Sequence, residues 1–342
     1  MANKRIEVSE FGGPEVLHLV EDEQLPEPQA GEIRVKVLAA GTGFTDTIIR
    51  QGQYIDVKDK PPFTLGYDWF GVVDKLGEGV TNLAIGQAVA DMPVIGSYTQ
   101  YLCVDANRVI TAPEGLDPAK AVAMILSYTT AYQMLTRIRK FKPGQSILIH
   151  AAGGAVGTAM LDLARTMGLI AYGTASVGKH GLVKEFNGIP IDYQNEDFVE
   201  RINTLTMGKG VDGVFDTIGG KSWSRSYSCL AKGGTLIAFG ALQLTTGEEK
   251  LPSLLLGFLK LSVLWNILPN GKKSVFYNIH KDREKNPKLF AEDLQTLFAM
   301  LRDDTLQPAI AGKRPLEDAV EVHHLIDRAD VPGKMVLIPN FE

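Results

Sequence analysis

The sequence predicts an α/β protein with two domains, one β-rich and one built on a doubly wound parallel sheet. Turn residues separate short extended runs over the first ~120 residues, and strands then alternate with helix-period segments, the order that produces βαβ units. The length of 342 residues also suits two domains, because one domain takes roughly 150 residues.

The β-rich part opens with a clear alternation of apolar and charged residues. Ile33–Val37 has the period of two that is typical of a half-buried antiparallel strand. Clusters of glycine and proline at 12–14, 41–43 and 77–79 separate further short runs. No segment with a helical period appears before Pro118, so this part is predicted to be a β domain.

The second part alternates strands with helices. Gln145–His150 is predicted to be a short apolar strand, and Ala155–Met167 repeats apolar residues on one helical face until Gly168 ends it. The same alternation predicts strands at Leu169–Thr174, Val211–Asp216 and Gly234–Gly240, and helices at Asp197–Met207 and from Asn286 to about Leu301. A last predicted strand, Gly333–Pro339, lies too far along the chain to be needed in this parallel sheet, so we expect it to return to the first domain.

Composition excludes several classes of protein. Lys and Arg number 35 against 40 Asp and Glu, a net charge of -5, so no basic excess is available for a phosphate backbone and no nucleic-acid partner is expected. Two cysteines, Cys103 and Cys229, cannot build a disulfide framework or a four-cysteine zinc lobe. Glu7 and Glu10 interrupt any apolar run near the N-terminus, so no signal peptide is predicted and a cytoplasmic location is expected.

One segment, Leu251–Leu268, is apolar over about the length of a membrane span. Lys260 lies at its centre, and a charge at mid-bilayer costs roughly 2.5–3.5 kcal/mol. Pro252 and Gly257 interrupt it further. We therefore expect a buried or interface helix without stable membrane insertion, with a membrane role as the alternative.

A glycine-rich turn joins the first predicted strand to the first predicted helix of the second part. Ala152–Gly157 (AGGAVG) fits the dinucleotide fingerprint of the Rossmann fold, with alanine in the first glycine position. Gly154 lets the backbone approach a pyrophosphate at the helix N-terminus, and Gly157 lets helix and strand pack closely. Gly154, Ala155, Val156 and Gly157 are thus predicted to bind a dinucleotide; a tight turn without ligand is the alternative.

The end of the second strand of this unit predicts which dinucleotide binds. NAD sites usually have a carboxylate at this strand end, about 20 residues after the glycine turn, which holds the ribose 2′-hydroxyl. Gly173–His180 contains no carboxylate, whereas Ser176 and Lys179 can hold a 2′-phosphate by hydrogen bond and charge. NADPH is therefore the predicted cofactor, and a solvated loop lysine at position 179 is the alternative.

Four stretches carry a resemblance to a known family: Gly41–Tyr54, Gly66–Val73, His150–Gly157 and Ile191–Ile202. They resemble the zinc-independent quinone oxidoreductase (zeta-crystallin-like) branch of the medium-chain dehydrogenase/reductase superfamily, in the right order over essentially the whole chain. The resemblance implies a GroES-like catalytic domain formed by residues 1–123 and 303–342, a Rossmann domain at 124–302, and a homodimer.

The metal ligands of the zinc alcohol dehydrogenases have no counterpart here. Those enzymes place a cysteine where this chain has Gly43 and a His-Glu pair where it has Tyr67-Asp68. A catalytic zinc needs three protein ligands, and His323 and His324 cannot supply them, since adjacent helical residues point about 100° apart. No metal is expected.

Without a metal, the chemistry predicted is hydride transfer to a quinone or enone, where one hydrogen-bond donor can stabilise the charge that develops on oxygen. The resemblance puts Tyr54 in the active cleft, and we predict its phenol as that donor; a packing lid residue is the alternative. Asp46 matches a family aspartate beside the nicotinamide, or else caps the neighbouring turn. The alternatives to such a reductase are an enoyl-thioester reductase and a largely non-catalytic NADPH-binding protein with a membrane or interaction role.

Further cofactor residues follow from the resemblance. Thr130 matches a residue near the nicotinamide, Tyr193 one near the adenosine phosphate, and Lys334 a basic residue near the cofactor, with a surface charge as the alternative for Lys334. Phe239 and Gly240 end a predicted strand at the carboxyl edge of the sheet, where such sheets bind ligands. Many quinone reductases have asparagine in place of Gly43 and glutamate in place of Asp68, so the substrate is not carried over.

Overall fold

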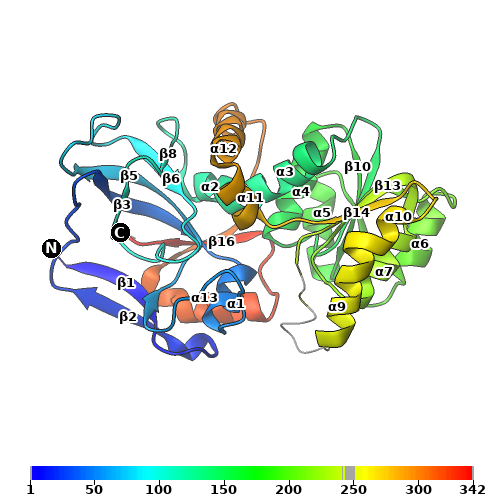
Figure 1. The fold of residues 1–342 in the computed structure, drawn as a ribbon, viewed down its shortest axis with the longest axis horizontal. Coiled ribbons are helices and arrows are strands. Elements are labelled where there is room, and N and C mark those ends of the chain that lie inside the picture. Colours follow the sequence, from blue (N-terminus) through cyan, green and yellow to red (C-terminus); the bar gives the residue numbers. More distant parts are fainter. Residues whose placement is uncertain (1, 241, 243–250, 341–342) are drawn as a thin grey trace. The chain divides into compact units, whose positions relative to one another are not determined.

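The computed structural model describes residues 2–240, 242 and 251–340. The chain forms two compact units, Met1–Thr129 with Asn286–Glu342 and Thr130–Lys285 (Figure 1). The boundaries expected from the sequence differ chiefly by one helix, α12 (Pro287–Arg302), which falls in the first unit. Phe298 of α12 packs its ring 6.1 Å from that of Phe70, so the apolar face of this helix completes the core of unit 1.

Unit 1 is the predicted β domain. The alternation at Ile33–Val37 is confirmed, because Ile33, Val35 and Val37 are fully buried in a strand. The last strand returns to this unit as expected, since Val336 pairs with Gly41. One sheet has the order β2 (Leu17–Asp22), β1 (Asn3–Val8), β4 (Phe63–Thr64); the larger has β15 (Ile310–Pro315), β16 (Lys334–Ile338), β3 (Glu32–Gly41), β5 (Asp68–Leu76), β6 (Ala88–Asp91), β8 (Ile110–Thr111), with β7 (Tyr101–Asp105) on β3.

The helices of unit 1 include one that the sequence did not predict. Helix α1 (Phe44–Arg50) lies before Pro118, and at seven residues it is too short to show a helical repeat. This helix carries Asp46, so the helix that the sequence failed to predict contains a predicted site residue. The remaining helices of unit 1 are η1 (Pro14–Val16), α2 (Pro118–Ala123), η2 (Met124–Tyr128), η6 (Leu316–Asp318) and α13 (Ala319–Asp327).

Unit 2 contains the predicted parallel sheet. Its strand order in chain sequence is 3-2-1-4-5-6, that of a dinucleotide-binding sheet whose ligand site lies where the order reverses. The strands are β11 (Ile189–Asp192), β10 (Ile170–Ala175), β9 (Ser146–Ile149), β12 (Val211–Asp216), β13 (Leu230–Ala238) and β14 (Lys273–Phe276). The helices are α3 (Thr129–Gln133), which begins one residue before the unit boundary, η3 (Met134–Ile138), α4 (Ala155–Thr166), η4 (Val177–Lys179), α5 (His180–Glu185), α6 (Phe198–Leu205), α7 (Lys221–Ser228), α9 (Leu251–Leu259), η5 (Lys260–Leu264), α10 (Trp265–Ile267) and α11 (Ile279–Lys285).

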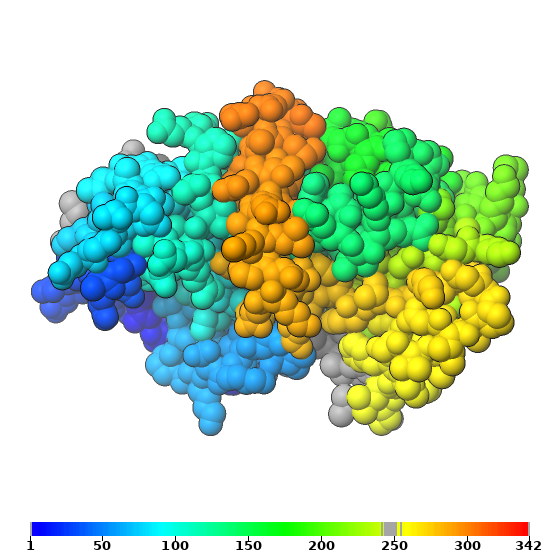
Figure 2. Space-filling view, turned by 45° about the horizontal axis from the view of Figure 1, so that its top comes forward, coloured from blue at the N-terminus to red at the C-terminus, as the bar shows by residue number. Residues whose placement is uncertain are grey.

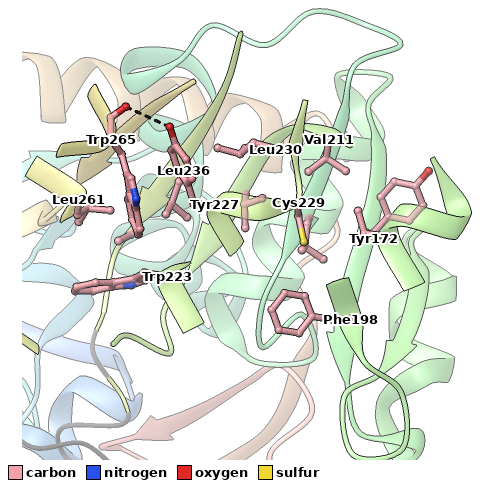
Figure 3. Packing of buried hydrophobic residues seen from close by; sticks show 14 of the residues in the cluster. Tyr172, Phe198, Val211, Trp223, Tyr227, Cys229, Leu230, Leu236, Leu261 and Trp265 are labelled. Carbon is pink, nitrogen blue, oxygen red and sulfur yellow. Dashed lines mark hydrogen bonds between the residues drawn. The ribbon is translucent and has the colours of Figure 1, made fainter. Parts of the chain in front are cut away.

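The core of unit 2 anchors the apolar segment at 251–268. The rings of Tyr227 and Trp265 stack with centroids 4.5 Å apart, and the Tyr227 hydroxyl donates to the Trp265 carbonyl (Figure 3). Leu261 is buried in the same cluster. These contacts bury one face of the segment.

The other face of this segment is open. Leu255 and Ile267 are 60% and 71% exposed, and Figure 2 shows the segment in yellow at the surface. The helix is therefore buried on one face only, and an interface at the exposed face stays a prediction. Within the part of the chain that the structure describes, no helix is long and apolar enough to cross a membrane.

Candidate functional site

The glycine turn of unit 2 lies at the carboxyl end of β9 and begins α4. Gly154 is the N-cap residue and no side chain caps the helix, so the first-turn N–H groups of α4 receive no side-chain acceptor. A methyl group on Gly157 would collide with the Ala151 carbonyl oxygen, which explains why glycine is needed there. An uncapped helix N-terminus behind a side-chain-free turn fits the pyrophosphate of a dinucleotide.

Lys179 and Ser176 lie beside this turn. A methyl group on Gly153 would come within 2.7 Å of the Lys179 Cδ atom, so the lysine side chain runs directly over the turn. Ser176 follows β10 immediately, and both residues are half-buried. Asp192, at the end of the neighbouring strand β11, already accepts hydrogen bonds from Gln194 N and Asn195 Nδ2. The charge beside the turn is therefore positive, which fits a phosphate.

The other predicted cofactor residues of unit 2 are dispersed. The Thr130 hydroxyl is buried and has no hydrogen-bond partner among the described residues, which leaves it available to a ligand. Phe239 and Gly240 follow β13 directly, and Gly240 packs against Thr217 after β12. Tyr193 follows β11 and is half-exposed. Their roles stay predictions.

A buried network that sequence reasoning missed fixes the carboxyl ends of β9 and β12. The Ser222 and Ser226 hydroxyls donate to Asp216 Oδ2 over 2.8 and 2.6 Å. Ser226 therefore accepts from His150 Nε2 over 2.9 Å, and His150 Nδ1 faces the Thr174 hydroxyl at 3.1 Å. Burial lowers the pKa of His150, so the ring is a neutral positioning group. In the sequence, the only sign of this network is a polar residue at the end of each otherwise apolar strand.

In unit 1, Asp46 lies in the first turn of α1. Its Oδ2 accepts the Gly43 N–H over 2.8 Å, so the capping role considered from the sequence is present. The side chain is fully buried, and its Oδ1 has no hydrogen-bond partner in the described chain. Burial, reinforced by the charge of Asp68, raises the pKa of Asp46 to about 7.

Tyr54 is paired with a second tyrosine. Its hydroxyl lies 2.9 Å from the Tyr67 hydroxyl, and the rings meet edge to face. Tyr54 is partly exposed, whereas Tyr67 is fully buried at the start of β5. Burial raises the pKa of Tyr54 to about 12, so its phenol keeps its proton at neutral pH.

Lys334 lies in unit 1, not at the surface. It is buried at the start of β16, with its Nζ 3.6 Å from Asp68 Oδ2. A methyl group on Gly41 would come within 2.7 Å of this Nζ, so glycine makes room for the pair. The surface-charge alternative for Lys334 is therefore wrong, while its place beside the cofactor stays a prediction. Neither the Tyr54–Tyr67 pair nor the Asp68–Lys334 pair could be found from spacing, because their partners lie on different elements.

Comparison with known proteins agrees with this fold. A model of the alcohol dehydrogenase GroES-like domain matches residues 29–114, and a model described as zinc-binding dehydrogenase matches residues 188–337. Quinone oxidoreductase 1 of Escherichia coli (strain K12) is 30% identical over 346 residues, covering 98% of this chain and 99% of that protein. The chain belongs to the zinc-independent quinone oxidoreductase branch of the medium-chain dehydrogenase/reductase superfamily. The resemblance and the fold class predicted from the sequence are thereby confirmed.

Other members of this superfamily match over nearly the whole chain. The human synaptic vesicle membrane protein VAT-1 homolog-like is 33% identical over 340 residues, which are 96% of this chain and 78% of that protein. The crystal structure of Escherichia coli quinone oxidoreductase complexed with NADPH has a TM-score of 0.86 at 29% identity, covering 98% of this chain and 100% of that one. The chain is thus similar both to reductases and to proteins named for a vesicle membrane.

One matched family description mentions zinc, but the side chains in the described part of this chain do not form a zinc site of that kind. Across the described residues, no group of three or more His, Cys, Asp or Glu side chains is arranged to hold a metal ion. Glycine stands at position 43 and tyrosine at position 67, neither of which ligates zinc in the manner of cysteine or histidine. The absence of a metal stays a prediction from the sequence.

Proposed function

We propose that this protein is an NADPH-dependent, zinc-independent reductase that transfers a hydride to quinones or α,β-unsaturated carbonyls. The observation that carries the proposal is the Tyr54–Tyr67 pair, which offers a protonated phenol in the GroES-like unit as a hydrogen-bond donor that needs no metal ion. A single hydrogen-bond donor suits acceptors in which the developing negative charge is spread onto one oxygen.

NADPH fits the residues of unit 2. The first-turn N–H groups at Gly154–Gly157 would hold the pyrophosphate, and Ser176 with Lys179 would hold the 2′-phosphate. The unpartnered Thr130 hydroxyl would bind at the nicotinamide end. The NADPH held by the similar Escherichia coli structure supports this assignment.

The chemistry divides between cofactor and chain. Bound NADPH supplies the hydride. The Tyr54 hydroxyl donates a hydrogen bond, and then a proton, to the acceptor oxygen, while the Tyr67 hydroxyl holds the Tyr54 phenol in place. The buried edge-to-face contact of the two rings limits the rotation of Tyr54 and so preorganises the donor.

One experiment tests cofactor and substrate class together. The purified protein is mixed with NADPH or NADH and a panel of quinones, enones and enoyl thioesters, and oxidation of the reduced nicotinamide is followed by absorbance. We expect oxidation that prefers NADPH and responds to a quinone or an enone. A higher kcat/KM for enoyl thioesters would favour the enoyl-thioester reductase instead, and failure to bind NADPH would refute the proposal.

The exposed face of α9 to α10 favours a second candidate, an NADPH-binding protein that acts at a membrane surface. Leu255, Leu259 and Ile267 are exposed there, and several similar proteins are named for a vesicle membrane. Sedimentation with liposomes tests this function. Lipid association that Leu255→Glu abolishes, together with NADPH binding but no acceptor reduction, would support it.

We further propose that two copies pair through unit 2. Strand β14 is an edge strand of the six-stranded sheet, and the exposed leucines of α9 lie on a neighbouring element. An open strand edge beside an apolar helix is a surface that soluble proteins usually cover. Sedimentation velocity should show a dimer, and Leu259→Glu should shift it toward monomer; a monomeric wild type would contradict the pairing.

A further inference from the structure

Charge is divided unevenly between the two units. Unit 1 contains 28 Asp and Glu residues against 16 Lys and Arg, whereas unit 2 contains 12 against 19. Unit 2 therefore has a positive surplus of 7 within a chain whose net charge is -5. A basic region in an acidic protein indicates a surface that meets an anionic partner.

The basic residues of unit 2 gather where its parallel strands begin. The six segments that lead into these strands are residues 139–145, 167–169, 186–188, 206–210, 229 and 268–272. They contain no Asp or Glu, and their basic residues are Arg139, Lys140, Lys142, Lys209 and Lys272. Lys232 and Lys273, near the starts of β13 and β14, add two more. Since the strands are parallel, all these residues lie at one edge of the sheet, which we call the amino edge.

Contacts between the segments make the amino edge one continuous surface. Arg139 Nη1 donates to the Gly233 carbonyl over 2.7 Å, which joins the segment before β9 to the start of β13. The Gly144 N–H donates to the Gly168 carbonyl over 2.8 Å and joins the same segment to the one before β10. A methyl group on Gly271 would lie 3.7 Å from Gly233 N, so the segment before β14 adjoins them.

The positive charge of this edge faces solvent. Its exposed lysines are Lys140, Lys142, Lys209, Lys232 and Lys273. Asp212, the second residue of β12, does not offset them freely, because it accepts the Ser146 N–H over 2.9 Å and the Gln145 Nε2–H over 3.0 Å. That carboxylate holds the segment before β9 in place, and the five ammonium groups are left for a partner.

Exposed apolar side chains lie among these lysines and indicate the kind of partner. Met207 is 82% exposed, Ile170 45% and Leu268 44%, and each lies at the start of a different strand or in the segment before it. Lysines at the level of lipid headgroups with apolar side chains below them are typical of a surface that lies on a bilayer. A single-stranded nucleic acid would need exposed aromatic rings to stack on, and the aromatic residues of the six segments, Phe141 and Phe186, are buried.

We propose that the amino edge docks unit 2 on an anionic lipid bilayer. The glycine turn at Gly154–Gly157 lies at the opposite, carboxyl ends of the strands, so docking leaves the cofactor site of unit 2 open. The surface is also distinct from the exposed face of α9 around Leu255. The inference goes beyond the proposed function, because it holds for a reductase and for a non-catalytic NADPH-binding protein alike.

Cosedimentation of the purified protein with vesicles tests this docking. We expect binding to phosphatidylcholine vesicles that contain about one third phosphatidylserine, and none to phosphatidylcholine alone. Raising the salt concentration from about 0.1 M to about 0.5 M should release the protein, because exposed charges are then screened. A lysine beside an anionic leaflet strengthens binding about fivefold, so the double variant Lys140→Gln/Lys142→Gln should bind about 25-fold more weakly.

A control variant removes the same net charge elsewhere. Lys221→Gln/Lys288→Gln changes exposed lysines of α7 and α12 and should bind like wild type. Met207→Asn removes an apolar side chain, and asparagine tolerates the positive φ of 51° at this position, so we expect binding to weaken about tenfold. NADPH binding, measured by fluorescence, should be unchanged in all three variants and shows that they are folded.

Four results would overturn the docking. They are no binding to anionic vesicles, equal binding to neutral vesicles, an equal loss in the control variant, and a preference for soluble polyglutamate, which would assign an acidic protein as the partner. Binding that Leu255→Glu abolishes and Lys140→Gln/Lys142→Gln leaves intact would place the contact on α9 and likewise refute it. A wild type that docks on anionic vesicles and binds no NADPH would refute the proposed function alone.

Discussion

At the scale of single residues, Tyr54 and Lys179 each perform one separable task in the proposed function. In that function Tyr54 would contact the acceptor and Lys179 the cofactor, and the two residues lie in different structural units. Removing the first should therefore change kcat without changing cofactor affinity, and removing the second should do the reverse.

Tyr54→Phe removes the donor while retaining the ring. We expect kcat to fall about 100-fold, the usual contribution of a positioned proton donor, while NADPH binding measured by fluorescence is unchanged. Tyr101→Phe, a change outside the site, serves as the control. Unaltered turnover in Tyr54→Phe would remove Tyr54 from the mechanism.

Lys179→Ala removes the charge that lies over the glycine turn. We expect the Kd for NADPH to rise about tenfold and that for NADH to change little, because only NADPH carries the 2′-phosphate. Lys184→Ala, on the exposed side of the adjacent helix α5, is the matched control. Equal losses for both cofactors would show that Lys179 acts on the fold or on the shared pyrophosphate.

Asp46 also predicts a pH dependence of stability. Its folded pKa of about 7 lies above the unfolded value of 3.8, so the folded state holds the extra proton between these values. The contribution of Asp46 to stability is therefore greatest at low pH and is lost as pH rises toward 7, by about 2–3 kcal/mol between about pH 5 and pH 7.5. Urea unfolding of wild type and Asp46→Asn at several pH values isolates this effect, since His323, whose pKa burial lowers to about 3, contributes equally to both. A constant difference between them would contradict it.

At the scale of elements, α1 is held by an arginine rather than by apolar packing alone. Arg50, fully buried, donates to Asp327 Oδ2 over 2.7 Å and to His323 Nδ1 over 3.0 Å, both on α13. It also donates to the Gly12 carbonyl. This clamp fixes the short helix that carries Asp46.

Arg50→Ala should consequently destabilise the protein by about 3–5 kcal/mol, because it leaves a buried cavity and an unpaired Asp327. The free energy of unfolding in urea measures this. Arg328→Ala breaks an exposed pair with Asp330 beyond the same end of α13 and should cost less than about 1 kcal/mol. Similar losses for both variants would mean that the clamp carries little stability.

At the scale of the whole molecule, unit 1 is closed by segments from both ends of the chain. The Thr42 hydroxyl and N–H both bond to the Met335 carbonyl, where β16 lies beside β3. The same contact places Lys334 beside Asp68. The buried Asp68–Lys334 pair therefore depends on the chain returning to its first domain.

The sequence by itself determined the alternating strands and helices of unit 2, the glycine turn and the returning strand β16. These features are local, because a hydrophobic period or a glycine at a strand–helix junction can be recognised without knowing which other segment packs against it. Helix α1 was not predicted, because seven residues are too few to show a helical period. Helix α12 was expected in the second domain, whereas the structure groups it with unit 1, because its pattern shows that one face is buried but not which element that face packs against.

Only the tertiary structure decided the pairing of Tyr54 with Tyr67, of Asp68 with Lys334 and of His150 with Ser226. Each pair joins residues on different elements, and its existence depends on how strands align after folding. The tertiary structure likewise decided that Asp46 is fully buried beside a second carboxyl, which changes its pKa and hence its chemistry. The type of a residue indicates which reaction it could take part in, whereas burial and neighbouring charges determine whether its proton is available.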